Sequence, residues 1–85
     1  MNDTERELVA RRVANHIIED LMYEPIPPLD LKAAALDIVK EIISDDAAEF
    51  ESIARLAVTA VVNDNRVTTT KTPMGNIMWF ERKSA

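Results

Sequence analysis

The sequence predicts an α+β protein that is mainly α, with three helices followed by a C-terminal β-hairpin. Through most of the first 62 positions, apolar residues recur at a spacing of three or four, which is the period of an amphipathic helix. After residue 65 the chain becomes rich in β-branched and aromatic residues, and its single glycine lies there. Such a segment is typical of two strands joined by a tight turn.

The size and composition predict one folded domain over residues 1–85. Apolar residues make up 47% of the chain and charged residues 29%, which is typical of globular and not of disordered proteins. A domain of this size buries only roughly 60 to 65% of the surface of its unfolded chain. Binding of a partner, or self-association, can therefore contribute to its stability.

The first helix is predicted over residues 4–23. Asp3 or Thr4 can cap its N-terminus, because both side chains accept hydrogen bonds from the first turn. Its apolar residues form one broad face made of two adjacent columns, Val9, Val13, Ile17 and Leu21 with Ala10, Ala14, Ile18 and Met22 beside them.

The segment "YEPIPPLD" has three prolines in four residues and is predicted to be a stiff, extended connector. Ile26 can anchor it through one short pairing with a strand edge. Asp30 is then expected to cap a second helix over residues 31–44. Its buried stripe is Leu31, Ala35, Ile38 and Ile42.

A third helix is predicted over residues 47–62. Asp46 and Glu49 have the spacing of a capping box, with aspartate in place of the usual serine or threonine. After Arg55 this helix is apolar almost all round, so we expect it to be the most buried of the three.

The hairpin is predicted over residues 66–83, with a turn at "PMGN". Alternation puts Ile77 and Trp79 on one face of the return strand and Met78 and Phe80 on the other. Three short helices can cover one of these faces, which leaves the other for a partner. Aromatic residues and methionine are enriched at interface centres, and the predicted partner-binding residues are therefore Met74, Met78, Trp79 and Phe80.

The charges divide the chain into an acidic body and a basic hairpin. The net charge is −5, yet residues 64–85 carry four positive and two negative charges. The basic side chains that can contact a nucleic-acid backbone are Arg66, Lys71, Arg82 and Lys83. Lysine is also common on exposed strand edges, where it prevents aggregation. An isoelectric point near 4.7 disfavours nucleic acid as the main ligand.

The order of the elements over residues 4–83 resembles that of winged helix-turn-helix domains, and the resemblance implies DNA binding with the third helix as the recognition helix. Such helices typically present arginine, lysine, glutamine or asparagine to base edges. Here the residues expected on the outer side are Glu49, Glu51, Ser52, Arg55 and Thr59. This acidic set favours a protein partner over DNA.

No combination of residues predicts catalysis, a metal site or a cofactor. There is no cysteine, and His16 is the only histidine. In "HIIED", His16 can reach Glu19 or Asp20 on the same helix, but two ligands make half a metal site, and we expect a surface histidine with a local ion pair. The lysine and glycine of "TTTKTPMGN" do not have the spacing of a phosphate-binding loop.

Acidic residues cluster before the third helix, at Asp45, Asp46, Glu49 and Glu51. Helix capping and the helix dipole explain such residues simply. An acidic face that docks a basic partner is the alternative.

No apolar run approaches the roughly 18 residues of a membrane span, and the start "MNDTERELVARR" has no apolar signal core. We therefore expect a cytoplasmic protein that does not bind membranes.

Together these features predict a small acidic, non-enzymatic protein-interaction module. It is expected to form a homodimer or larger homo-oligomer, or to dock on a larger complex as a regulator or inhibitor, through its C-terminal hairpin. The alternative is a winged-helix transcriptional regulator that binds DNA through the basic hairpin.

Overall fold

The first helix, α1 (Asp3–Asp20), is capped at its N-terminus by Asn2 and not by the predicted Asp3 or Thr4. In this computed structural model, which describes residues 1–83, Asn2 and Glu5 form a reciprocal capping box. The Glu5 backbone N–H donates to the Asn2 side chain at 2.8 Å, and the Asn2 N–H donates to the Glu5 carboxylate at 3.4 Å. The helix ends three residues before the predicted position 23, in a turn over residues 21–23.

The second helix, α2 (Pro28–Ile42), starts three residues before the predicted Leu31. The first helical position needs no hydrogen bond from its own N–H, and the fixed φ of proline suits it. The predicted cap at Asp30 was wrong, because Asp30 lies inside the first turn. Leu31 and Ala35 of the predicted stripe are buried.

The third helix, α3 (Phe50–Asn63), follows a short 3₁₀ turn, η1 (Ala47–Glu49). The predicted capping box was wrong, because no capping side chain makes a hydrogen bond at the N-terminus of η1, at Asp46, or at the N-terminus of α3, at Glu49. α3 buries four of its 14 residues and α1 buries five of its 18, so the two helices are buried to nearly the same fraction, and α2, with three of 15, to a smaller one. α3 is not buried all round, however, because Leu56 and Val62 are exposed. The other two helices cover only one side of α3.

The C-terminal segment forms the predicted antiparallel hairpin, with strands β1 (Val67–Lys71) and β2 (Ile77–Arg82). Gly75 occupies the turn with φ of +89°, a conformation that suits glycine. On the other edge of β2, Ile26 pairs with Phe80 through two backbone hydrogen bonds of 3.0 and 2.8 Å. The predicted short edge pairing of the connector is therefore confirmed.

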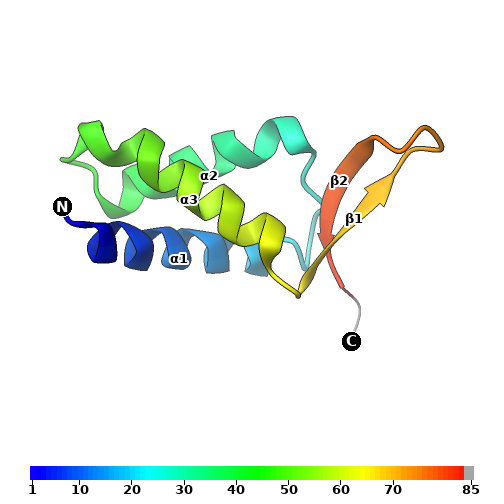
Figure 1. The fold of residues 1–85 in the computed structure, drawn as a ribbon, viewed down its shortest axis with the longest axis horizontal. Helices are drawn as coiled ribbons and strands as arrows, with labels where there is room; N and C mark the ends of the chain where they lie inside the picture. The colour runs from blue at the N-terminus through cyan, green and yellow to red at the C-terminus, as the bar shows by residue number, and fades with distance from the viewer. Residues whose placement is uncertain (84–85) are drawn as a thin grey trace.

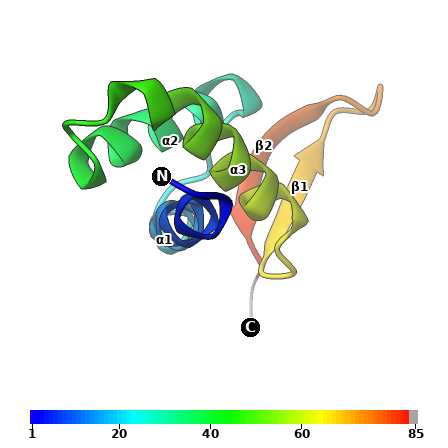
Figure 2. The same ribbon diagram turned by 60° about the vertical axis from the view of Figure 1, so that its left-hand side comes forward.

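The three helices pack together at one end of a molecule that measures 42 × 25 × 20 Å (Figure 1). The hairpin stands at the other end, with its turn farthest from the helices. In the turned view, β2 and β1 lie beside the helical layer and not within it (Figure 2). The side chains buried most completely in the core are Val13, Ile17, Ile18, Leu31, Val39, Ile53 and Val61. None of the helices described over residues 1–83 has the length and hydropathy needed to cross a bilayer.

Candidate functional site

The base of the hairpin belongs to the hydrophobic core. Phe80 is 5% exposed and Val67 is 8% exposed, and both join the cluster of buried helical side chains. Phe80 was among the predicted partner-binding residues, which were expected on the face of β2 turned away from the helices. It faces them, because Ile26 and β1 hold β2 in register on either side of it. Phe80 therefore stabilises the fold.

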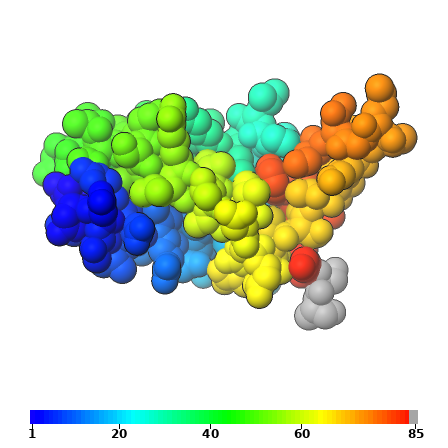
Figure 3. All heavy atoms as spheres, viewed as in Figure 1, coloured from blue at the N-terminus to red at the C-terminus, as the bar shows by residue number. Residues whose placement is uncertain are grey.

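The outer part of the hairpin is exposed and apolar. Met74 in the turn is 89% exposed, and Ile77 and Met78 at the start of β2 are about 40% exposed. Leu29, in the first turn of α2, is 93% exposed, and α2 contacts β2. These four residues, Leu29, Met74, Ile77 and Met78, are called the hairpin-end surface below. The space-filling view shows the hairpin projecting beyond the helical body (Figure 3).

The exposure of both Ile77 and Met78 follows from an irregularity in the ladder. Thr70 pairs with Trp79, but the next residue, Lys71, pairs with Ile77, so the ladder passes over Met78. Such a bulge interrupts the strict alternation of side chains between two faces. The predicted alternation, with Ile77 on the face of Trp79 and Met78 on the face of Phe80, therefore does not hold across the bulge.

Trp79 is half-buried on the face of the hairpin opposite Phe80. Its indole Nε1–H donates to Glu81 Oε2 at 3.3 Å, and the Thr70 hydroxyl donates to Glu81 Oε1 at 2.7 Å. These bonds fix the ring on the hairpin. Trp79 remains a predicted contact residue, since part of the ring is accessible.

The outer edge of β1 presents backbone groups without partners among residues 1–83. The Lys83 N–H donates to the Arg66 carbonyl at 2.9 Å, and the Thr72 N–H donates to the Asn76 carbonyl at 2.8 Å, so even-numbered residues direct their backbone groups toward β2. Odd-numbered residues of an antiparallel strand then direct theirs away. The edge is therefore formed by Val67, Thr69 and Lys71.

The four predicted basic residues do not form one patch. Arg66 Nε donates to Asp64 Oδ1 and Arg66 Nη2 donates to Asp64 Oδ2, both at 2.9 Å. Arg66 Nη2 also donates to Asn15 of α1 at 3.0 Å. Lys71 lies near the turn, whereas Arg82 and Lys83 lie at the base of the hairpin.

The Arg66–Asp64 pair changes the titration of both groups. Hydrogen bonds from the Arg66 side chain and backbone N–H lower the pKa of Asp64 from 3.8 to about 2. The hydrogen bond to Asp64 raises the pKa of Arg66. Arg66 is thus neutralised locally and is a weak candidate for phosphate contact.

Two of the four acidic residues predicted to cluster before α3, Glu49 and Glu51, are ion-paired. Arg6 of α1 donates to both oxygens of Glu49, from Nε at 2.6 Å and from Nη2 at 3.1 Å. Glu51 accepts from Lys32 and, at 3.1 Å, from Arg55 Nε. These hydrogen bonds, from Arg6 and from Lys32 respectively, lower the pKa of Glu49 and of Glu51. Asp45 and Asp46 have no ion pair among residues 1–83. The acidic docking face considered from the sequence therefore stays a prediction that concerns these two carboxylates.

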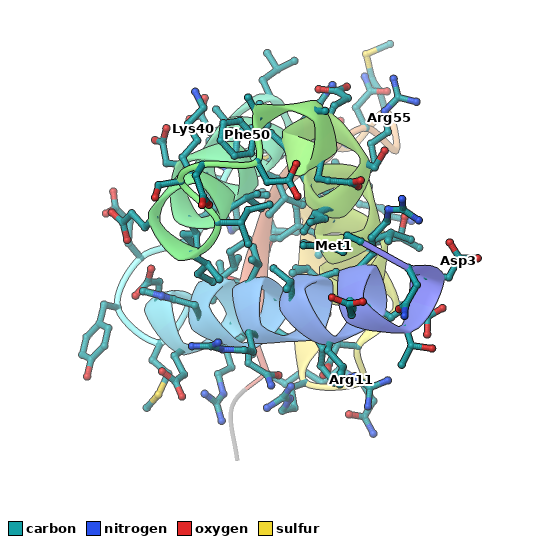
Figure 4. All side chains as sticks on the ribbon, turned by 90° about the vertical axis from the view of Figure 1, so that its left-hand side faces the viewer. Met1, Asp3, Arg11, Lys40, Phe50 and Arg55 are labelled. Atoms are coloured by element: carbon teal, nitrogen blue, oxygen red, sulfur yellow. The ribbon has the colours of Figure 1, made fainter. Side chains whose placement is uncertain are left out.

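An open groove of about 530 Å³ lies between the start of α1 and α3, and its lining includes Asp3, Ser52, Arg55 and Thr59. The view onto this end of the molecule shows Asp3 and Arg55 projecting outward (Figure 4). The outer side of α3 therefore carries paired charges and short polar side chains. It does not present the set of donors that reads base edges.

His16 is an exposed residue of α1, with Nε2 4.0 Å from Asp20 Oδ2 one turn later. It lies on the rim of an open groove of about 380 Å³ between α1 and α2, near Glu19 and Glu41. Among residues 1–83, no group of three or more histidines and carboxylates has a geometry that could hold a metal ion.

Comparison with known protein families, with curated proteins and with solved structures finds no match to this chain.

Two features of the site were not predicted from the sequence. Leu29 could have been found from helix periodicity had α2 been predicted to begin at Pro28, because it lies two residues, or about 200°, from the buried Leu31. The open edge of β1 depends on which strand lies outermost in the sheet. No local pattern in "VTTTK" determines that.

Proposed function

We propose that this chain is a non-enzymatic protein-interaction module that binds a protein partner through the hairpin-end surface. The observation that carries the proposal is the exposure of Met74, Ile77 and Met78 on a hairpin that projects beyond the helices. Burying this surface against a partner gains about 25 cal/mol for each Å² of apolar area removed from water.

The composition of the surface favours a protein over other ligands. Methionine is flexible and polarisable, and it adapts to the shapes of protein partners. The surface is convex and projecting, whereas small molecules bind in concave pockets that enclose most of their area. Lys71 stands beside the surface and has no ion pair among the described residues, so an acidic residue of the partner can complement it.

A photo-crosslinking amino acid at Met74 or at Met78 tests the proposal in the cells that produce the protein. We expect one defined cross-linked protein from both hairpin positions, and much less of it from Lys40, an exposed control position on α2. Mass spectrometry identifies the product, including a second copy of this chain. Equal yields from the hairpin and control positions would contradict the proposal.

The identified partner is then titrated with purified variants. Met78→Lys places a charge in the proposed interface and should weaken binding at least tenfold. Leu56→Lys is the matched control, because Leu56 is 39% exposed and Met78 is 40% exposed. Leu56 lies in the middle of α3, on the groove that Asp3 and Arg6 also line, and not on the hairpin. If both variants bind equally well, the hairpin end is not the interface.

DNA binding through the basic hairpin is the alternative function, supported by the element order and by exposed Lys71 and Lys83. The Arg66–Asp64 pair and the paired charges on α3 make it the weaker proposal.

A further inference from the structure

We infer that the outer edge of β1 pairs in antiparallel fashion with the β1 edge of a second copy of this chain, about a two-fold axis beside Thr69. The inference rests on the proposed function because it concerns the same hairpin. It adds the identity of the partner, a second copy of this chain, for the outer backbone edge of β1. The joined sheet would contain β2 and β1 of one protomer followed by β1 and β2 of its partner.

The edge is open at Thr69 and Lys71 in the described part of the chain, and at Val67 only through the carbonyl. Thr69 directs both its N–H and its C=O outward, and neither has a hydrogen-bond partner among residues 1–83. The same holds for the N–H of Lys71 and for the C=O of Val67. The Val67 N–H is the exception, because it donates to the Asp64 carbonyl at 3.1 Å.

These groups complement themselves in one register. When Thr69 faces Thr69 of the second copy, the two residues exchange two hydrogen bonds, as a hydrogen-bonded antiparallel pair does. Lys71 then faces Val67, so the Lys71 N–H of each protomer reaches the free Val67 carbonyl of the other. All four free donors of the two edges are satisfied. The Val67 N–H, which is already bonded to the Asp64 carbonyl, lies at the end of the ladder between the two protomers.

The register also avoids the repulsion that opposes many self-pairings. Like charges directly opposite each other destabilise a sheet, and here Lys71 faces the uncharged Val67. The helices lie at the Val67 end of the hairpin and the turn lies at the other end (Figure 1). An antiparallel arrangement therefore puts the two helical bodies at opposite ends of the joined sheet. The contact is isologous and closes after two copies, so it does not propagate into a fibre.

The hairpin gains stability from such a neighbour. Two strands without a third are marginally stable in water. Ile26 supplies a third strand only beside Phe80, since the prolines at positions 27 and 28 have no N–H to continue the pairing. The part of the hairpin from Thr69 to the turn has no such support, and β1 of a second copy would supply it.

Cysteine cross-linking tests the register, and the absence of native cysteines gives a clean background. In the proposed register, Thr68 of one copy faces Thr70 of the other at a Cα separation of about 4.5 Å. An equal mixture of Thr68→Cys and Thr70→Cys chains should therefore form mostly the mixed disulfide on mild oxidation. Either variant alone should cross-link poorly, because an offset of two residues puts its cysteines beyond the roughly 7 Å that a disulfide spans.

A second experiment removes one donor of the edge. Lys71→Pro deletes the outward N–H but none of the hydrogen bonds between β1 and β2, and it should weaken the dimer about tenfold or more in sedimentation equilibrium, since two symmetric bonds are lost. Lys71→Ala keeps the N–H and should dimerise like the wild type. Circular dichroism checks that both variants fold.

Three outcomes separate this inference from the proposed function. A wild-type chain that remains monomeric up to about 1 mM overturns the inference, and the proposed function stands if photo-crosslinking identifies another protein. A dimer in which the cysteine mixture shows no preference also overturns the inference, because the contact then lies elsewhere. A dimer with the mixed disulfide supports the inference even if Met78→Lys binds every other partner normally.

Discussion

At the scale of single residues, two large apolar side chains of β2 differ sharply in exposure. Phe80 is 5% exposed and packs with the helices, whereas Met78, two residues earlier, is 40% exposed. Both are large apolar residues in the same strand, so their chemistry alone does not distinguish them. What distinguishes them is their backbone surroundings: the ladder passes over Met78 at the bulge, whereas Phe80 pairs with Ile26.

Truncating these two residues should separate stability from binding. Phe80→Ala should lower the free energy of unfolding by about 3 to 5 kcal/mol, because it leaves a cavity in the core. Met78→Ala should lower it by less than about 1 kcal/mol. Urea unfolding followed by circular dichroism measures both values. Equal losses would show that Met78 is also part of the core.

The Asp64–Arg66 pair predicts a pH dependence of stability. The pKa of Asp64 in the folded protein, about 2, lies below its ordinary 3.8. The ionised carboxylate therefore stabilises the fold above about pH 4, and that contribution is lost as the pH falls toward 2. Asp64→Ala should be less stable than the wild type at pH 6, and the difference should shrink progressively between pH 4 and pH 2. Thermal melting over this range measures it, and a constant difference would contradict the assignment.

At the scale of elements, the hairpin depends on its turn. Gly75 has φ of +89°, and a β-carbon added at this position would meet no atom within 4 Å. Any cost of a larger residue there comes from backbone strain and not from a steric clash.

Gly75→Ala should therefore destabilise the hairpin by about 1 to 2 kcal/mol. The only tryptophan, Trp79, lies in β2, so its fluorescence reports on the hairpin, while circular dichroism reports mainly on the helices. The neighbouring substitution Asn76→Ala is the control and should have little effect, because the Asn76 side chain makes no hydrogen bond among the described residues. If Gly75→Ala unfolds like the control, the turn does not require a positive φ.

At the scale of the whole molecule, the distribution of charge opposes nucleic-acid binding. The net charge is −5, and the positive charges of the hairpin are divided between its two ends. On α3, Glu51 pairs with Lys32 and with Arg55. A polyanion would meet few unpaired cations on any one side.

We therefore expect no shift of labelled duplex DNA in a mobility assay at about 50 mM salt and protein concentrations up to about 100 μM, conditions that detect even weak non-specific binding. A shift that weakens steeply with added salt, and that is lost in Lys71→Glu, would support the alternative function. Lys40→Glu changes the net charge equally at a distant site and serves as the control.

The predictable part of the candidate site was its location. The two-sided apolar pattern of residues 77–80 correctly marked the hairpin as exposed and apolar in part. Which side chains are exposed was not predictable, because a bulge changes the face of a side chain without leaving a local signal. Leu29 was missed because the start of α2 was placed after the prolines and not at Pro28.

The sequence by itself determined the order and type of the elements. Helix periodicity, the proline-rich connector and the β-branched C-terminal segment are local properties, and each acts over a few neighbouring residues. Only the tertiary structure decided which ends and edges of those elements have partners. Glu49 accepts hydrogen bonds from Arg6 and does not take part in the predicted capping box. Ile26 pairs with one edge of β2, and the outer edge of β1 stays open. These outcomes depend on contacts between residues far apart in the chain, where the free energy of packing and of long-range hydrogen bonds outweighs local preference.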